Sequence, residues 1–427
     1  MGSIKQTSAF EKSQFIPPDA IFDVTRRYLA DTDPNKVNLG QGTYRDENGQ
    51  SWILPSVRAA EAALGEPGHE YLPIAGFKPF RDEAVKLVFG STKAYAENRV
   101  KTTHNHLHSL SPASLTTTKQ VASCQSLSGT GALLLAGLAL KKADTGIKTI
   151  YITDPTWSNH DLLFASMGFA VKSLPYYKDR AFDFDGYMAT LKTAEPGSAV
   201  ILHACAHNPT GCDPSREQWK QIAAVIIERG VFPVFDSAYL GFNSGNVDED
   251  AWAIRYFVDE LALEAAVCMS FAKSMGLYGE RIGAVTFVAR DAETTRTVSS
   301  ILENVQRATV SNPPAFGARI AAKVLGTPEI REQWAKDLVT MSGRIRAMRK
   351  KVYDELVRLQ TPGDWSHIVK QSGMFGYTGI SKAQVQHLEE KYHVHMADTS
   401  RISIAGLNEK NVEYFAKALD DTVRSVA

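Results

Sequence analysis

Residues 270–283, SFAKSMGLYGERIG, decide the fold, because a buried strand ends there and a polar site begins. The apolar run LEAAVCMS (263–270) predicts that strand, and Lys273 follows it at once. Arg281 comes eight residues after Lys273, on glycine-rich backbone. A lysine with only a structural role is normally solvated. The position of Lys273 directly after a buried strand therefore raises the question of whether its amine has a function.

The chain around this stretch alternates short β-rich runs with helical patterns. The helix at 214–230 is well marked, since Ser215 and Gln218 have capping-box spacing and Gly230 ends it. Apolar strands that alternate with helices imply an α/β fold, with a mostly parallel sheet covered by helices on both faces. The predicted strands are residues 148–153, 198–205, 231–235, 265–270 and 284–289.

The sequence pattern changes near residue 330. Long charged amphipathic helices appear there, followed by a glycine-rich turn and short strands in SGMFGYTGI and RISIAGL. This pattern predicts a second, smaller α+β domain. A chain of 427 residues is long enough for two or three domains, and we find no internal repeat.

Composition excludes several classes of function. Lys plus Arg and Asp plus Glu both number 47, which gives no reason to expect nucleic acid or a membrane surface as a partner. No apolar run approaches the roughly 18 residues of a membrane span, and the N-terminus lacks the features of a secretory or mitochondrial leader. The four cysteines show neither a Cys-x-x-Cys pair nor zinc-type spacing. We therefore expect free thiols, no metal and a reducing, cytoplasmic location.

Polar and aromatic residues follow the predicted strands, at the edge where open parallel sheets bind their ligands. Each has an ordinary structural explanation by itself: a core or rim tryptophan, a β-turn, a helix cap or a surface lysine. Together they supply an aromatic face, an amide, a carboxylate, a phenol and an amine, which suit a bound aromatic heterocycle. These residues are Trp157, Asn208, Asp236, Tyr239 and Lys273.

The stretch QSLSGTGALLLAGLALKKA (125–143) adds a phosphate-binding pattern. Ser128, Gly129 and Thr130 precede a long apolar helix, and backbone N–H groups at a helix N-terminus attract anions. The pattern is neither a dinucleotide fingerprint nor a P-loop, and small residues at helix starts are common. With Arg281 as a fixed cation, it fits a phosphate. A ring, a phosphate and an amine together indicate pyridoxal 5′-phosphate (PLP), joined to Lys273 as a Schiff base.

The chain resembles the aspartate aminotransferase family, which are fold-type-I, class I PLP enzymes. The resemblance extends from PPDAIF (17–22) to the C-terminus, and its motifs occur in order along the chain. They are VNLGQGTYRDENG, EYLPIAGF, QSLSGTGA, DPTWSNH, HACAHNPTG, FDSAYLGF, SFAKSMGLYGERIG, SNPPAFGARI, GMFGYTGI and SRISIAGL.

The resemblance implies a role for each residue around the cofactor. Lys273 would be the Schiff-base lysine and then the proton shuttle, while Asp236, supported by His160, would keep the pyridine nitrogen protonated. Trp157 would stack on the ring, and Tyr239 and Asn208 would bond its phenolic oxygen. The phosphate would be held by Ser128, Gly129, Thr130, Ser270, Arg281 and, from the partner subunit, Tyr71.

The resemblance also implies the reaction and the assembly. Arg401 would bind the α-carboxylate of an amino acid, Gly42 would line the pocket, and Arg307 would reach across a homodimer to the side-chain carboxylate. Two guanidinium groups suit a substrate with two carboxylates. The expected reaction converts L-aspartate and 2-oxoglutarate to oxaloacetate and L-glutamate. The alternatives are an aromatic amino acid aminotransferase on the same scaffold and a phosphate-binding module without chemistry.

The same resemblance divides the chain into domains. Residues 1–15 would form an N-terminal arm and residues 52–340 a large PLP-binding domain. A small α+β domain would be built from both chain ends, residues 16–51 and 341–427.

Three features depart from the family pattern. Gln41 stands where the family usually has an apolar residue, and Ser400 replaces the more usual glycine before Arg401. The Thr-, Ser- and His-rich residues 100–120 have no counterpart, and without them AENR joins VASCQSLSGTG as the family has it. Their ends fit an unspliced in-frame intron, and the alternative is a genuine surface loop. Either way we predict an exposed insert, because it has too few apolar residues to order itself.

Overall fold

The computed structural model describes residues 8–96 and 121–426. The predicted insert at 100–120 lies outside these residues, as do the first seven residues of the predicted N-terminal arm. Within the described ranges, no helix combines the length and apolarity needed to cross a bilayer. All four cysteines are free, and three of them are buried, as the sequence predicts.

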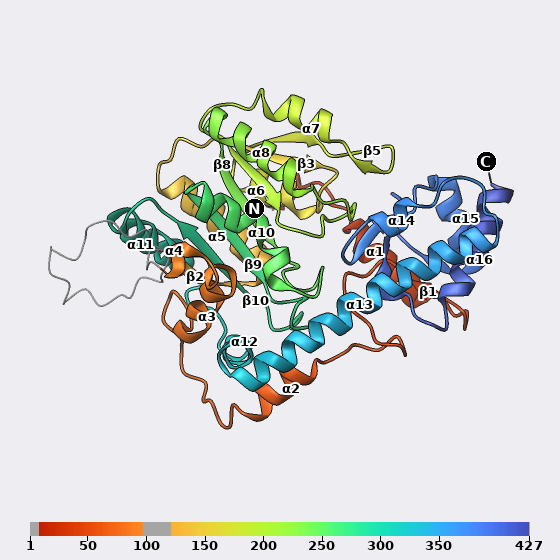
Figure 1. Ribbon diagram of the computed structural model, residues 1–427, viewed down its shortest axis with the longest axis horizontal. Coiled ribbons are helices and arrows are strands. Elements are labelled where there is room, and N and C mark those ends of the chain that lie inside the picture. Colours follow the sequence, from red (N-terminus) through yellow and green to blue (C-terminus); the bar gives the residue numbers. More distant parts are fainter. Residues whose placement is uncertain (1–7, 97–120, 427) are drawn as a thin grey trace, which may run out of the picture.

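A seven-stranded sheet forms the centre of the large domain (Figure 1). Six of its strands run parallel, and β10 pairs antiparallel with both of its neighbours. This arrangement confirms the predicted α/β fold with a mostly parallel sheet. The strands, in spatial order, are β2 (Val121–Leu127), β10 (Ile282–Val288), β9 (Ala265–Ser270), β8 (Phe232–Ser237), β7 (Ala199–His203), β3 (Thr149–Asp154) and β4 (Ala170–Pro175).

Both faces of the sheet are buried, which explains why its strands are continuously apolar. In β7, Val200 and Leu202 belong to one hydrophobic core, whereas the alternate residues Ala199 and Ile201 belong to the other. Helices cover both faces, among them α5 (Ser128–Lys142) and α8 (Arg216–Arg229). The predicted capping box at the start of α8 is present, and Gly230 ends the helix at a φ of 60°.

The smaller domain joins the two ends of the chain. Strand β1 (Val37–Asn38) pairs in parallel with β12 (Val394–His395), so residues more than 350 apart lie side by side. The long helix α13 (Pro328–Arg358) runs from α2 (Pro55–Ala62) and α12 (Phe316–Gly326) in the large domain to α16 (Val412–Ser425) in the small one (Figure 1). A small domain built from both chain ends is therefore observed, while its boundaries at residues 51 and 341 stay a prediction.

The remaining elements complete the two layers around the sheet and the small domain. The helices are α1 (Ala20–Ala30), α2 (Pro55–Ala62), α3 (Lys78–Phe89), α4 (Lys93–Ala96), α6 (Asn159–Ser166), α7 (Phe184–Leu191), α9 (Val247–Asp250), α10 (Trp252–Arg255), η2 (Tyr256–Glu260), α11 (Ala292–Thr309), α12 (Phe316–Gly326), α14 (His367–Lys370), α15 (Lys382–Tyr392), η3 (Ile404–Gly406) and α16 (Val412–Ser425). The short strands are β5 (Tyr177–Lys178), β6 (Ala181–Phe182), β11 (Phe375–Tyr377) and β13 (Arg401–Ser403).

Candidate active site

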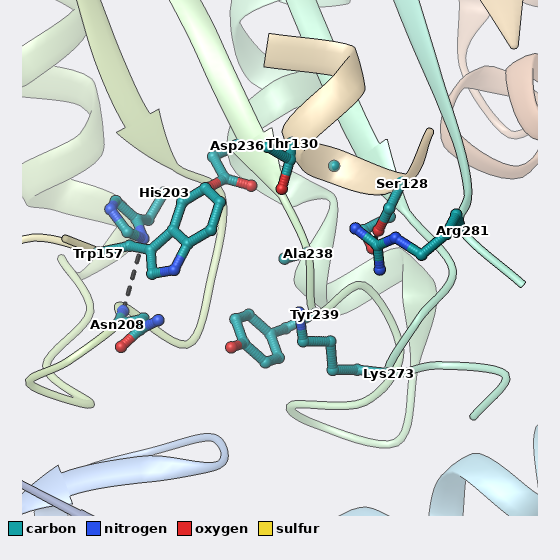
Figure 2. A pocket seen from close by; sticks show the side chains of 12 residues that line it. Ser128, Thr130, Trp157, His203, Asn208, Asp236, Ala238, Tyr239, Lys273 and Arg281 are labelled. Carbon is teal, nitrogen blue, oxygen red and sulfur yellow. Dashed lines mark hydrogen bonds between the residues drawn. The ribbon is translucent and has the colours of Figure 1, made fainter. Parts of the chain in front are cut away.

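A cavity of about 230 Å³ opens at the carboxyl ends of the parallel strands (Figure 2). Strand ends and the loops after them supply most of its walls, as expected for an open α/β sheet. Of its twelve lining residues, ten are predicted site residues, and His203 and Ala238 are additional. The lining comprises Ser128, Gly129, Thr130, Trp157, His203, Asn208, Asp236, Ala238, Tyr239, Ser270, Lys273 and Arg281.

One end of the cavity is built for an anion. Helix α5 begins at Ser128, so the N–H groups of its first turn have no partner inside the helix. Gly129 packs so closely on Ser270 that an added Cβ would lie 3.1 Å from the Ser270 Cβ. The hydroxyls of Ser128 and Ser270 are 3.0 Å apart. Arg281 stands beside them, held by a 3.0 Å hydrogen bond from its Nη1 to the carbonyl of Tyr278.

A buried carboxylate closes the opposite end. Oδ2 of Asp236 lies 3.0 Å from Nε2 of His160, which is fully buried. Burial by itself would raise the pKa of Asp236, but the hydrogen bond and the electrostatic interaction with His160 hold that pKa below its usual value. Asp236 is therefore an anion that can stabilise a protonated ring nitrogen.

Lys273 lies between these two ends. Its Nζ is 5.5 Å from the centre of the Tyr239 ring, and both side chains face the cavity in Figure 2. Burial lowers the pKa of Lys273; Asp236 opposes this shift and Arg281 adds to it. Burial raises the pKa of Tyr239, which keeps its hydroxyl protonated at neutral pH. A depressed pKa increases the fraction of the lysine that is unprotonated at neutral pH, and only that form can act as a nucleophile or accept a proton.

Behind Asp236, the predicted His160 is joined by a second histidine, His203, which is not among the residues predicted from the sequence. Thr156 Oγ1 lies 2.8 Å from His160 Nδ1 and 3.2 Å from His203 Nε2. Burial, followed by the charge of His160, lowers the pKa of His203 to about 3, so this ring stays neutral. His203 is the last residue of β7. Ligands of open parallel sheets bind at the carboxyl ends of the strands, so the position of His203 in the sequence could have identified it, as it identified Asp236.

The predicted substrate residues Arg401 and Gly42 form a second group, outside the lining of this cavity. The guanidinium of Arg401 lies 4.3 Å from the centre of the Phe375 ring, and its Nη2 donates to the carbonyl of Gly40 at 2.7 Å. An added Cβ at Gly42 would lie 3.0 Å from Phe375 Cζ. Nε of Arg401 is buried and has no hydrogen-bond partner among the residues that the structure describes. A buried donor of this kind is suited to bind a carboxylate.

Two other predicted residues lie away from the cavity of their own chain. Arg307 is exposed near the end of α11 and donates to the hydroxyl of Ser311. Tyr71 is 83% exposed. Neither contributes to the lining of the cavity, so their predicted roles require a second subunit.

The two unusual residues near the substrate group have local explanations. The side-chain oxygen of Gln41 accepts a 2.8 Å hydrogen bond from Nη2 of Arg45 and lines a separate cavity, with Thr43 and Asn38. Ser400 has a φ of 67°, in the left-handed region that favours glycine. Its hydroxyl accepts a 3.2 Å hydrogen bond from the N–H of Gly379, which offsets part of the backbone strain.

The opposing effects of backbone strain and the hydrogen bond from Gly379 predict how substitutions at Ser400 change stability. Ser400→Ala keeps the strained backbone but loses the hydrogen bond from Gly379, so we expect it to destabilise the protein by about 1 kcal/mol. Ser400→Gly loses the same bond but relieves about 1 kcal/mol of strain, so it should be close to the wild type. Urea unfolding of the three proteins measures the order. An alanine variant as stable as the glycine variant would contradict this account.

Known proteins share both the sequence and the fold of this chain. The family described as Aminotransferase class I and II matches residues 34–419. A cytoplasmic aspartate aminotransferase from Schizosaccharomyces pombe is 46% identical over 416 residues, covering 96% of each chain. The solved structure of aspartate aminotransferase from Saccharomyces cerevisiae cytoplasm is similar, with a TM-score of 0.89 and 42% identity, covering 98% of this chain and 99% of that one. An aromatic-amino-acid aminotransferase from Burkholderia pseudomallei, covalently bound to pyridoxal phosphate, also has a TM-score of 0.89, at 37% identity, covering 98% of this chain and 100% of that one.

Proposed function

Because the chain belongs to the class I and II aminotransferase family, we propose that it transfers the amino group of L-aspartate to 2-oxoglutarate, giving oxaloacetate and L-glutamate. The observation that carries the proposal is Lys273, a partly buried amine with a depressed pKa, which lines one cavity with a buried carboxylate and a helix N-terminus. The relatives named aspartate aminotransferase support aspartate as the amino donor.

The residues around the cavity fit PLP, on which the family depends. The start of α5, with Ser128, Ser270 and Arg281, would hold its phosphate, and Asp236 would hold its ring nitrogen protonated. Trp157 would cover one face of the ring, while Asn208 and Tyr239 would donate to its phenolic oxygen. PLP, when bound, supplies an aldehyde that accepts the amino group and a ring that takes up electrons from the substrate.

The chain's own residues then bind the substrate and move its proton. The unpaired Nε of Arg401 gives a guanidinium edge for the α-carboxylate. Nζ of Lys273 would take the proton from the substrate Cα and return it during the transfer. Its depressed pKa favours the neutral amine that this step needs. Asp236 is buried and Lys273 is partly buried, so limited access of water would strengthen the electrostatic interaction between them.

The proposal includes a homodimer with shared sites. Three large apolar side chains near the N-terminus are strongly exposed: Phe10 by 79%, Phe15 by 86% and Ile16 by 85%. Their exposure supports a protein interface in this region. The exposed positions of Tyr71 and Arg307 agree with roles in a neighbouring site. A cytoplasmic location is supported by the two aspartate aminotransferases named or described as cytoplasmic.

A visible absorption spectrum together with kinetics on two amino donors tests the function. The purified protein should be yellow and should turn over aspartate with a higher kcat/KM than phenylalanine, with 2-oxoglutarate as acceptor. The faster use of phenylalanine would favour the aromatic alternative, which shares the fold. A protein that stays colourless after incubation with PLP would contradict the proposal and favour a binding module.

Deletion of residues 100–120 should leave transamination intact or improved. The preceding helix α4 ends at Ala96 and β2 begins at Val121, so the deletion spares every described element. We expect unchanged kcat/KM for aspartate, and we expect transcripts that join the codons of Arg99 and Val121. Loss of soluble protein on deletion, with the full-length chain purified in parallel as the control, would show that the segment belongs to the fold.

A further inference from the structure

Helix α13, which links the two domains, carries a buried arginine with no role in the proposed chemistry. Arg349 is 2% exposed, and among the described residues no carboxylate forms an ion pair with it. Burial lowers its pKa to about 10, so the guanidinium remains charged at neutral pH. A buried cation without a counter-ion is costly unless hydrogen bonds replace its water.

The hydrogen bonds that replace water around Arg349 come from a single segment, residues 368–375, which we call the clamp loop. Nη1 of Arg349 donates to the carbonyl of Ile368 at 3.2 Å and to the side-chain oxygen of Gln371 at 3.4 Å. Nη2 donates to the carbonyls of Ser372, Gly373 and Phe375 at 3.1, 3.0 and 2.6 Å. One planar guanidinium therefore determines the course of the whole clamp loop.

The clamp loop contacts the large domain at residues 204–213, which we call the cofactor loop because it carries Asn208. The N–H of Ser372 donates to the carbonyl of Gly211 at 2.7 Å, and its hydroxyl donates to Asp213 at 2.9 Å. Asp213 in turn accepts from the backbone N–H groups of Ala206 and His207, both at 2.8 Å.

The two loops approach so closely that larger residues would separate them. An added Cβ at Gly211 would lie 2.6 Å from the carbonyl oxygen of Phe375, and one at Gly373 would lie 2.4 Å from the Cβ of Ala206. Both glycines have positive φ angles, 67° and 72°. The spacing between the clamp loop and the cofactor loop is therefore set to within a fraction of an ångström.

The other end of the clamp loop supports the substrate arginine. Phe375 begins β11, and its ring lies under the guanidinium of Arg401 at 4.3 Å. β11 pairs with β13 so that Tyr377 is opposite Arg401. A shift of the clamp loop would therefore move Phe375 and Arg401 together, relative to Asn208.

We propose that Arg349 is a positioning residue for substrate binding: through the clamp loop it holds Arg401 in register with the cofactor loop. This proposal rests on the function proposed above, in which Arg401 binds the α-carboxylate. Every amino and oxo acid substrate has that carboxylate, and it is present in the ground state and the transition state alike. Misplacing Arg401 should therefore raise KM much more than it lowers kcat.

Steady-state kinetics of variants at Arg349 test the proposal. Arg349→Met keeps the length of the side chain without its donors, and we expect KM for aspartate and for 2-oxoglutarate to rise about 10-fold or more, with kcat within about 3-fold. Arg349→Lys retains the charge and fewer donors, so its KM should lie between those of Arg349→Met and the wild type. The dissociation constant of succinate, a dicarboxylate without an amino group, should rise in parallel when measured by tryptophan fluorescence.

Arg346 offers a matched control three residues earlier on α13. It is exposed and donates to the carbonyls of Asn243 and Ser244, at 3.5 and 3.0 Å, rather than to the clamp loop. Arg346→Met should leave KM and succinate binding unchanged. Ser372→Ala removes the bond to Asp213, and its effect on KM should be less than additive with that of Arg349→Lys, because both act through one loop.

The outcomes separate the inference from the function on which it rests. A wild-type KM in Arg349→Met, a loss confined to kcat, or an equal effect of Arg346→Met would overturn the role of Arg349. If Arg349→Met fails to fold, Arg349→Lys and Ser372→Ala decide the matter, and strictly additive effects on KM would then overturn it. A wild-type chain that does not transaminate aspartate would overturn the proposed function, and the inference with it.

Discussion

Lys273→Ala should reduce transamination of aspartate by about 10³-fold or more while the protein still binds PLP. The change removes both the amine that would join the cofactor and the base that would move the substrate proton. The anion-binding start of α5, Arg281 and Asp236 remain, so affinity for the cofactor should persist. Single-turnover kinetics and a PLP titration of the same preparation measure the two effects separately.

Borohydride reduction identifies the lysine directly. Reduction of the wild-type protein should fix the cofactor on the peptide that contains Lys273, and the alanine variant should give no labelled peptide. Lys220→Ala, at an exposed position on α8, is the control and should leave both activity and labelling unchanged. Labelling at any lysine other than residue 273 would refute the assignment.

Mixing two inactive homodimers should restore activity if Arg307 acts in the neighbouring site. Lys273→Ala and Arg307→Ala should each be nearly inactive with aspartate, because one loses the amine and the other a guanidinium for the side-chain carboxylate. In a mixed dimer, one site carries both changes and the other carries neither. Random reassortment gives about half mixed dimers, so about a quarter of all sites should recover.

The design of this experiment depends on proof of subunit exchange. Chains with tags of different mass show by native mass spectrometry whether mixed dimers have formed. Mixed Lys273→Ala and Asp236→Ala chains are the control, since both residues line one cavity of one chain and their mixture should recover nothing. Mixed dimers of Lys273→Ala and Arg307→Ala without activity would place Arg307 in the site of its own chain.

Much of the site could be predicted because it follows from local patterns. The apolar run before Lys273 forms β9, and the capping box at Ser215 begins α8. Parallel strands bring their carboxyl ends to one edge, so residues that directly follow them meet without further information. Asp236 and Asn208 line one cavity for this reason. Arg401, Arg307 and Tyr71, in contrast, were predicted only through resemblance to a family.

The sequence by itself predicted five of the seven strands of the sheet, the capped helix at 214–230, the site at the strand ends and the helix start at Ser128, because each depends on residues close together in the chain. Strands β2 and β4 were not among the predicted strands. Only the tertiary structure decided that β10 runs antiparallel, that β1 pairs with β12, that His203 stands behind Asp236, and that Arg349 holds the clamp loop. Strands that pair across hundreds of residues share no local sequence pattern, so their pairing cannot be predicted from spacing. A buried arginine cannot be told from a solvated one in the sequence, because its burial depends on residues far away in the chain. Local periodicity therefore specifies the elements of this protein, whereas packing between its two domains specifies the substrate side of its site.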